Sequence, residues 1–563
     1  MKNRKKKLPI GIENFEKLQS EGFYYIDKTS FIQALLEDWA EVNLFTRPRR
    51  FGKSLNMSML KRFFELGTDP GIFQNLAIAE ETALCEEYMG QFPVISVSLK
   101  GINGNTYQMA LDMADQLIRA EARRFQYLLD SEKLTDHDKE ALIELLRGKS
   151  GEGLLCSSLK ILSELLEKHH DCPVILLIDE YDVPLAKAFE HGYYDQMVTF
   201  IRNMLEYALK TNDSLKFAVL TGCMRISKES IFTGLNNLKV LSVTDVQFDE
   251  FFGFTDREVR DMLEYYELSG HYGEMKEWYD GYQFGNVEVY CPWDVINYCD
   301  ALRADPEARP KNYWLNTSSN EAVRRFIRES ENAVIRKEIE KLVAGEVIVK
   351  EIHPELTYKE MYASVENLWS VLFTTGYLTQ RGRPEGDAFP LAIPNVEIRN
   401  IFTTQIMEFF KETVPKNGEM LEKFCTALLE GDAGQVESLL GGYLRRTISI
   451  RDTFVQKRMK ENFYHGILVG ILGFADTWGV SSNKESGDGY SDILIETDDG
   501  ENGIILELKY AEDGKLEDAC RAALQQAEDK RYEEMLLDDG VEHILKYGIA
   551  FYKKRCRVML AAG

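Results

Sequence analysis

The fold is decided by the stretch Leu44-Phe45-Thr46-Arg47-Pro48-Arg49-Arg50-Phe51-Gly52-Lys53-Ser54. A β-branched and aromatic run leads into a basic loop that ends in Gly-Lys-Ser, and an apolar-periodic helix pattern follows at once. Strand, loop, Gly-Lys-Ser and helix are the layout of a phosphate-binding P-loop. The full signature has glycine five positions before Gly52, where Arg47 stands here. An ordinary helix start is the alternative for the tripeptide alone.

The chemistry of a P-loop assigns roles to these residues. Backbone N–H groups and the positive helix end face the phosphates, while the lysine and the hydroxyl reach phosphate and Mg²⁺. The sequence therefore predicts ATP and Mg²⁺ as cofactors, with Ser54 as a metal ligand. The expected nucleotide-binding residues of the loop are Arg49, Arg50, Gly52, Lys53 and Ser54.

A second stretch, PVILLIDEYD at 173–182, is a continuous apolar run that ends in acids. Such a run is typical of a buried parallel strand whose carboxyl end opens on a ligand site. We expect Asp179 to hold Mg²⁺, directly or through water, and Glu180 to polarise the attacking water. The alternative is a buried strand followed by a solvated acidic turn.

Further motifs accompany these two, namely LPIGIENFEKL (8–18), YYIDKT (24–29), LTGCMRISKESIFTGLNNL (220–238) and WYDGY (278–282). Together with RPRRFGKSL and LLIDEYD they make the chain resemble the bacterial AAA-ATPase-like family over nearly its whole length. Members of that family often carry a C-terminal PD-(D/E)XK nuclease-like domain, and the arginine-rich loop is their usual form. The resemblance implies that 23–26, which we expect to be an aromatic strand, packs near the adenine; simple core packing is the alternative.

Two more apolar runs, 92–99 and 215–221, alternate with long helical patterns, which predicts a parallel, doubly wound sheet. The order resembles the additional-strand branch of P-loop ATPases. There the run ending in Thr221 lies between the other two, so that Thr221 points towards the γ-phosphate. Arg225, in the polar stretch that follows, is our candidate for a cation beside the transferring phosphoryl group. An arginine on a solvated turn is the alternative.

The C-terminal part holds two strand-like runs, 491–496 and 504–509, around a turn at 498–501. A hairpin centred on that turn pairs position i with 999 − i, so Asp492 faces Glu507. Lys509 lies two residues beyond Glu507 and projects to the same side. PD-(D/E)XK nucleases have this arrangement, in which two carboxylates hold Mg²⁺ and the lysine orients or activates water. A register slipped by one would separate the carboxylates, and a surface ion pair is the other alternative.

Two neighbours support the nuclease interpretation. Glu461 opens an amphipathic helix at 461–472 with His465 one turn later, and family members share this Glu-x-x-Tyr-His. Some related nucleases use that glutamate as an extra metal contact, so Glu461 is a candidate metal ligand. Gln526 matches the family's glutamine on a helix that would pack against the hairpin. Tyr490 stands where the family commonly has arginine, which leaves metal binding intact and puts substrate binding in doubt.

Composition sets limits on these interpretations. Nine cysteines without paired spacing suit reduced thiols in a cytoplasm, and no apolar run approaches the ~20 residues of a membrane span. The basic start lacks the apolar segment of a secretory signal. The net charge of −25 means that any nucleic-acid contact must be local and salt-sensitive.

We expect a multidomain α/β protein. Its predicted parts are a P-loop AAA-ATPase-like core (1–250), a helical lid with an aromatic insertion (251–344), a winged-helix-like and helical linker (345–445) and a restriction-endonuclease-like PD-(D/E)XK domain (446–563). Three hypotheses follow: an ATP-dependent nuclease acting on DNA or RNA, with defence against foreign DNA as one setting; a nucleotide-switched sensor or scaffold; and a plain ATPase with a degenerate C-terminus. The intact Asp492, Glu507 and Lys509 favour the first over the third. A homo-oligomer is left open.

Overall fold

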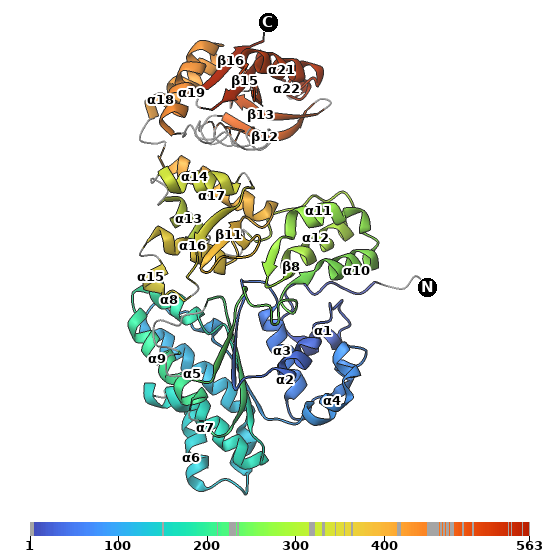
Figure 1. Cartoon of the computed structure of the whole chain (residues 1–563), viewed down its shortest axis with the longest axis vertical. Coiled ribbons are helices and arrows are strands. Elements are labelled where there is room, and N and C mark those ends of the chain that lie inside the picture. The colour runs from blue at the N-terminus through green and yellow to red at the C-terminus, as the bar shows by residue number, and fades with distance from the viewer. Residues whose placement is uncertain are drawn as a thin grey trace. The chain divides into compact units, whose positions relative to one another are not determined.

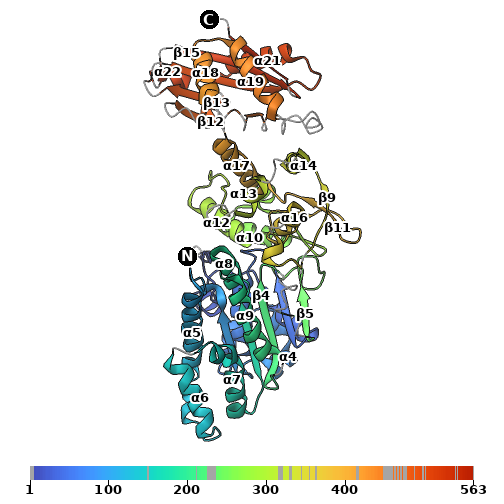
Figure 2. The same cartoon turned by 90° about the vertical axis from the view of Figure 1, so that its left-hand side faces the viewer.

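The computed structural model of the chain comprises two compact units, Met1–Ser318 with Val349–Glu397 and Ser319–Ile348 with Ile398–Gly563 (Figures 1 and 2). It describes residues 5–561 except 149–150, 211, 225–231, 233–235, 315–320, 329–332, 344, 354, 362–363, 414–417, 448–460, 462–463, 466–467, 469–471, 473–477, 487–488, 498–499, 501, 539, 542 and 554. Within this described part of the chain, no helix is both long and apolar enough to cross a bilayer.

A parallel sheet of five strands forms the centre of the first unit, in the order β2-β3-β4-β1-β5. Every residue of β1 and β3 is buried, as expected for strands covered on both faces. Because β4 lies between β3 and β1, the additional-strand order expected from the sequence is confirmed. The bounds are β1 Val42–Thr46, β2 Val94–Ser98, β3 Val174–Asp179, β4 Leu215–Gly222 and β5 Leu238–Leu241.

Helices cover both faces of this sheet, with α5, α7 and α9 on one side and α1, α2 and α3 on the other (Figure 1). The helical patterns of the sequence are present, but 23–26 forms no strand. That expectation was wrong because aromatic residues stabilise a strand only where neighbouring strands pair with them. The bounds are α1 Phe15–Ser20, α2 Ser30–Glu37, α3 Lys53–Phe64, α4 Thr82–Tyr88, α5 Tyr107–Arg124, α6 Asp136–Arg147, α7 Glu152–His170, α8 Val183–His191 and α9 Tyr194–Leu209.

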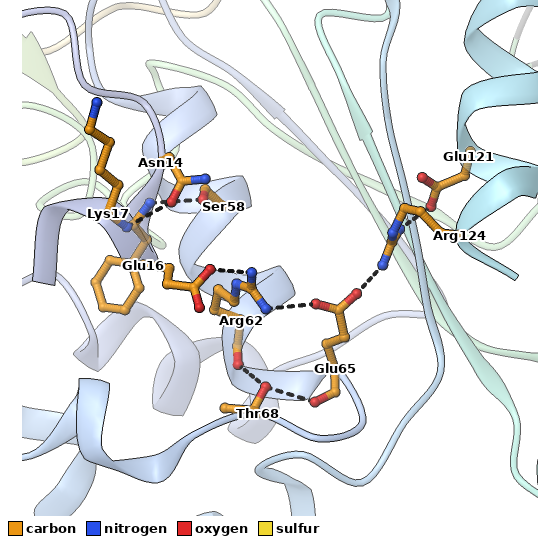
Figure 3. A network of polar contacts seen from close by, with 10 residues as sticks. Asn14, Glu16, Lys17, Ser58, Arg62, Glu65, Thr68, Glu121 and Arg124 are labelled. Atoms are coloured by element: carbon orange, nitrogen blue, oxygen red, sulfur yellow. Dashed lines mark hydrogen bonds and ion pairs between the residues drawn. The ribbon is translucent and has the colours of Figure 1, made fainter. Parts of the chain in front are cut away.

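A polar network at the far end of α3 links this helix to α1 and α5 (Figure 3). Arg62 of α3 donates to Glu16 of α1 and to Glu65, and Glu65 also accepts from Arg124 of α5. Earlier in α3, the Ser58 hydroxyl accepts the first backbone N–H of α1 at 2.9 Å. Each of these partly exposed ion pairs contributes little alone, about 0–1 kcal/mol, but together they orient the helix whose first turn carries Lys53 and Ser54.

The aromatic WYDGY motif belongs to a separate layer of the first unit. Its two tyrosines, Tyr279 and Tyr282, are buried, and Tyr282 begins the first strand of the β7–β8 hairpin. The three strands of this layer are ordered β6-β8-β7. The bounds are β6 Phe254–Thr255, α10 Asp256–Tyr266, α11 Tyr272–Tyr279, β7 Tyr282–Phe284, β8 Val287–Tyr290 and α12 Pro292–Ala304.

A helix, a strand, a loop and a second strand follow in the order expected for a winged-helix-like module. A third strand, β9, completes the small sheet in the order β10-β11-β9. The bounds are β9 Ile348–Glu351, α15 Tyr358–Met361, α16 Val365–Thr374, β10 Thr379–Gln380 and β11 Ala388–Ala392. The next helix, α17 (Val396–Thr413), begins in the first unit and continues into the second.

The second unit is built on a mixed sheet of five strands, β12-β13-β14-β15-β16, in which only β14 and β15 run parallel. α21 packs on β14 and β15, and α19 packs on β16. The bounds are α13 Glu321–Arg328, α14 Ala333–Val343, α18 Gly418–Leu429, α19 Ala433–Thr447, β12 Trp478–Ser486, β13 Gly489–Thr497, β14 Asn502–Tyr510, α21 Leu516–Asp529, α22 Glu534–Asp538, β15 His543–Tyr552 and β16 Arg555–Leu560. The multidomain α/β class is therefore confirmed.

The β13–β14 hairpin has the register predicted from the sequence. Ile493 pairs with Leu506 and Glu496 with Gly503, so paired positions sum to 999. Ile493, Ile495, Ile504 and Leu506 join one buried core, whereas Leu494 and Ile505 join another on the opposite face with α21. The side chains at odd and even positions of each strand thus lie on opposite faces of the sheet.

Candidate active sites

The P-loop between β1 and α3 turns by means of two residues in the left-handed region. Gly52 has φ +82°, which suits glycine because it has no Cβ, and Arg50 has φ +73° in spite of its side chain. Lys53 then begins α3, so the free N–H groups of the first helical turn point out of the loop. Strained backbone of this kind occurs at ligand sites.

Arg47, which replaces the first glycine of the usual signature, has a structural role. Its side chain is fully buried and donates to the carbonyl oxygens of Thr46 and Leu241, at 2.9 and 2.8 Å, and of Phe248 at 3.3 Å. The guanidinium also lies 5.0 Å from the ring centre of Phe252. Arg47 therefore fastens the loop to the chain beyond β5 and is not placed to meet a nucleotide.

Lys53 is folded back into its own loop. Its ammonium donates to the carbonyl oxygens of Arg47 and Pro48, each at 3.0 Å, and lies 3.9 Å from a carboxylate oxygen of Glu180. Burial lowers the pKa of Lys53, but the surrounding acidic groups more than offset this and leave the pKa raised. The lysine stays charged, so it is available to a phosphate that displaces the two carbonyls.

Asp179 at the end of β3 meets hydroxyls from two other elements. One oxygen accepts from Ser54 at 2.7 Å, and the other accepts from Thr221 at the end of β4. Three residues predicted separately are thus brought into one contact group. A carboxylate and two hydroxyls are oxygen ligands of the type that Mg²⁺ prefers, and these residues fit such an ion.

Glu180 directly follows Asp179 and has φ +54°, another non-glycine residue in the left-handed region. Its N–H donates to the Thr221 hydroxyl at 3.3 Å, and its side chain is half-buried on the side of Lys53. The unusual backbone turns this carboxylate towards the P-loop rather than into the solvent. The position suits a residue that contacts a water beside bound phosphate.

Asp182 belongs to the same group, and the sequence analysis gave it no role. One oxygen accepts the backbone N–H groups of Cys223 and Met224, at 2.9 and 3.1 Å. Its other oxygen is buried and receives no hydrogen bond from the described residues. Burial, and then the charge of Glu180, raise the pKa of Asp182 to about 6. The acid-rich end of LLIDEYD was the available signal, but only the fold brings the loop after β4 to Asp182.

A cavity of about 450 Å³ opens beside the P-loop. Arg49, Arg50, Gly52, Lys53, Ser54 and Glu180 line one part of it, and the segment 24–26 with Trp293 and Ile296 lines another. Five predicted nucleotide-binding residues therefore border one space, and a largely apolar wall stands next to them. Arg225, the predicted cation near the transferring phosphoryl group, lies outside the described residues.

In the second unit, the ladder between β13 and β14 ends at Ile493 and Leu506. Beyond that point, side-chain carboxylates rather than backbone carbonyls of β13 accept the N–H groups of β14. Asp492 accepts the N–H of Leu508 at 2.8 Å, and Glu461 accepts the N–H of Tyr510 at 3.0 Å. Two predicted metal ligands are thus held at the free edge of β14 by backbone donors.

Glu507 is the most confined of these acids, with 1% of the residue exposed. One oxygen accepts from Lys509 at 3.2 Å and from Gln526 of α21. The second oxygen is buried and receives no hydrogen bond from any described residue. Burial, and then the charge of Asp492, raise the pKa of Glu507 to about 7. A buried acid with an unsatisfied oxygen fits a divalent cation, which would supply the missing positive charge.

A second layer of residues orients this group. Gln526 also lies 3.3 Å from the hydroxyl of Tyr532, and His465 is hydrogen-bonded to the backbone oxygen of Asp492 at 2.7 Å. Gln526 therefore lies where the sequence predicted it, on a helix packed against the hairpin. The side chain of Tyr490 lies outside the described residues. No group of three or more His, Cys, Asp or Glu side chains that could hold a metal is found in the described part of the chain.

Comparison with known proteins finds a matching family model for the region around each of the two sites. Residues 9–232 match the family described as "Predicted AAA-ATPase", and residues 459–560 match the "PD-(D/E)XK nuclease superfamily". The chain is thus similar to a different family in each of these two regions. The resemblance stated from the motifs is therefore confirmed for both regions. A relative from Azotobacter chroococcum mcd 1, described as "Uncharacterized protein in vnfD 5'region", is 28% identical over 407 residues, which cover 70% of this chain and 69% of the relative.

Proposed function

We propose that the chain is a nucleotide-hydrolysing ATPase whose PD-(D/E)XK domain cleaves phosphodiester bonds of nucleic acid with a divalent metal, such as Mg²⁺. The observation that carries the proposal is the buried carboxylate of Glu507, with one oxygen that has no donor among the described residues, beside Asp492 and Lys509. A structural ion pair does not need such an oxygen, and leaving it unsatisfied destabilises the fold.

In the proposed nuclease site, Asp492 and Glu507 would hold the cation, and Glu461 would support the same edge of β14. When bound, the cation would polarise the scissile phosphate and the attacking water. Lys509 would orient that water and stabilise the negative charge that develops on phosphate. Gln526 would keep Glu507 turned towards the metal by donating to its other oxygen.

In the proposed ATPase site, Lys53, Arg49 and the N–H groups of the first turn of α3 would bind the phosphates. Ser54, Asp179 and Thr221 form the oxygen-rich group that would hold Mg²⁺, directly or through water. Glu180 would accept a proton from the attacking water or orient it. Arg225 remains our candidate for the additional cation.

The test is a cleavage assay with single- and double-stranded DNA and RNA, with Mg²⁺ or Mn²⁺, and with or without ATP. Cleavage should require metal, disappear in Asp492→Ala and Lys509→Ala, and weaken steeply with salt because the chain is acidic. Glu496→Gln, on the same strand as Asp492, is the matched control and should cleave like the parent. Equal activity in the parent and both site variants would refute the assigned residues.

A second candidate is a nucleotide-switched sensor whose nuclease-like domain binds nucleic acid without cleaving it. It is favoured by Tyr490 and by the acidic balance of residues 451–563, which hold 15 basic and 22 acidic side chains. Metal-dependent binding without cleavage of any of the four substrates would select this candidate.

For either candidate we propose a cytoplasmic setting, in which the nine free cysteines stay reduced. Defence against foreign DNA is the role we propose for the nuclease, to be tested by phage challenge with the Asp492→Ala variant.

A further inference from the structure

One arginine of the P-loop faces away from the phosphate-binding residues. Arg50 lies with its guanidinium 4.5 Å from the ring centre of Trp293 and donates to the carbonyl oxygen of Tyr313 at 3.4 Å. Yet Arg50 and Trp293 both line the cavity that Lys53 and Ser54 border. The side chain can therefore adopt either of two positions, one in the nucleotide cavity and one in contact with Tyr313.

A pair of buried carboxyls lies behind Arg50. Asp294 is in the first turn of α12 and Glu397 in the first turn of α17, and each is at most 1% exposed. Neither oxygen of Asp294 receives a hydrogen bond from a described N–H or hydroxyl group, and neither does Oε2 of Glu397. The two carboxyls face each other, and burial raises the pKa of both. A proton shared between them satisfies both carboxyls and leaves one negative charge on the pair, and the Cys291 thiol is a further hydrogen-bond partner of Asp294.

Arg50 is the cation that balances this charge. Burial lowers the pKa of Arg50, whereas Asp294 and Glu397 act on it in the opposite direction. A buried charge without a partner destabilises a fold strongly. Arg50 therefore stabilises the carboxyl pair while it lies on Trp293, and this stabilisation is lost when Arg50 leaves.

A single peptide group joins Arg50 to Glu397. The carbonyl of the Tyr313–Trp314 peptide accepts from Arg50, and its N–H donates to Glu397 at 2.7 Å. Glu397 is the second residue of α17, the helix that continues into the second unit. The P-loop is thus connected by two hydrogen bonds to the start of the helix that leads towards the nuclease domain.

We infer that Arg50 is a nucleotide-responsive contact, released from the Tyr313–Trp314 peptide when phosphates occupy the P-loop, and that its release loosens the first turn of α17. The inference rests on the proposed nucleotide binding and adds a route by which the nucleotide state reaches the second unit. Phosphate groups compete for Arg50 because they offer more negative charge and a better bidentate geometry than one backbone carbonyl. A ligand shifts such an equilibrium only by its difference in affinity for the two arrangements.

The experiment measures amide hydrogen exchange by mass spectrometry with and without Mg²⁺ and a slowly hydrolysed ATP analogue. In the parent chain, nucleotide should speed exchange at the Trp314 amide and in the first turn of α17. The Asp294→Asn/Glu397→Gln double variant removes the charge of the pair while preserving its shape. Because only the Tyr313 carbonyl and the Trp293 ring then hold Arg50, this variant should bind nucleotide severalfold more tightly, and its exchange response should fall by at least half.

The control is Glu121→Gln. Glu121 is also a buried glutamate of the first unit, and it accepts the N–H of Ser96 at 2.8 Å as Glu397 accepts that of Trp314. It should respond to nucleotide like the parent. Nucleotide binding by the parent without any change in exchange at the two places would overturn the inference and leave the ATPase proposal standing. A parent that binds no nucleotide would refute both. If the double variant does not fold, Asp294→Asn alone replaces it, and a full parental response in the variant used also overturns the inference.

Discussion

The two candidate sites of this chain balance their charges in different ways. At the P-loop, Asp179 accepts two hydroxyls and Lys53 is bonded to two carbonyls of its own loop. At the nuclease-like site, Glu507 is buried with one oxygen that has no donor among the described residues. The first site satisfies Lys53 and Asp179 internally, although one oxygen of Asp182 there receives no hydrogen bond from the described residues, whereas the second leaves an oxygen of its central acid without a donor among them.

The difference indicates what each ligand has to do. Phosphates entering the P-loop must displace the internal partners of Lys53, so binding exchanges one set of hydrogen bonds for another. A cation entering the second site displaces nothing on the free oxygen of Glu507 and relieves an existing electrostatic cost. Variants should therefore weaken ligand binding at the first site, whereas at the second site one variant should stabilise the metal-free protein.

The largest effect is expected for Lys53→Ala. It removes the buried ammonium that would neutralise phosphate charge, so nucleotide binding should become undetectable at millimolar ATP, as measured with a fluorescent ATP analogue. Lys61→Ala, on the same helix and away from the cavity, should bind like the parent. If Lys53→Ala bound nucleotide as tightly as the parent, the P-loop assignment would be wrong.

Glu180→Gln should separate binding from hydrolysis. The amide keeps the shape of the side chain but cannot accept a proton from water, so ATP turnover should slow by about 100-fold or more while binding persists. Steady-state phosphate release measures this, with Glu190→Gln on the exposed end of α8 as the control. Parental turnover in the Glu180 variant would remove it from the mechanism.

Arg47→Leu tests whether the arginine in the glycine position is structural. The variant leaves three carbonyl contacts without their donor, so the free energy of unfolding should fall by about 2 kcal/mol in a denaturant titration. The neighbouring Arg49 is exposed, and Arg49→Leu should change stability little. Equal stability of both variants with the parent would contradict the role given to Arg47.

The smallest expected effect is a gain in the free energy of unfolding rather than a loss. Because the folded pKa of Glu507, about 7, lies above its ordinary 4.5, the charged form destabilises the fold, and this cost grows as pH rises from 4.5 through 7. Glu507→Gln should therefore raise the free energy of unfolding of the metal-free protein at pH 8 by on the order of 1 kcal/mol, with little gain at pH 4. Denaturant titrations at both pH values measure this. A loss of stability at pH 8 would show that the acid is not strained.

Much of this architecture could be predicted from local pattern. The apolar runs ending in Asp179 and Thr221 give buried parallel strands, and the turn at 498–501 sets a register that the pairing of Ile493 with Leu506 confirms. Ser54, predicted from the Gly-Lys-Ser loop, lies in the first turn of α3, and Gln526, expected from the family resemblance, lies on α21 against β14. The P-loop layout followed from local pattern as well, whereas the two families and the order of the central strands were expected from the resemblance to known families.

Other features depend on contacts between distant segments, and no local sequence pattern predicts them. Asp182 is hydrogen-bonded by the loop after β4. Glu397 is hydrogen-bonded by the Tyr313–Trp314 peptide, more than 80 residues earlier in the chain. The segment 23–26 has strand-like composition, but no described strand pairs with it, and its residues 24–26 line a cavity wall instead. Burial and pairing of this kind are properties of the folded chain and not of any single motif.

The central claim is that the Glu507 site takes a divalent cation, and thermal unfolding measures it most directly. Mg²⁺ or Mn²⁺ titrated into the parent chain at pH 7.5, without nucleotide or nucleic acid, should raise the Tm of the second unit in a saturable way. Glu507→Gln should start from a higher Tm and show no metal-dependent rise, while Glu496→Gln should follow the parent. An equal metal-dependent rise in the parent and in Glu507→Gln would contradict the account.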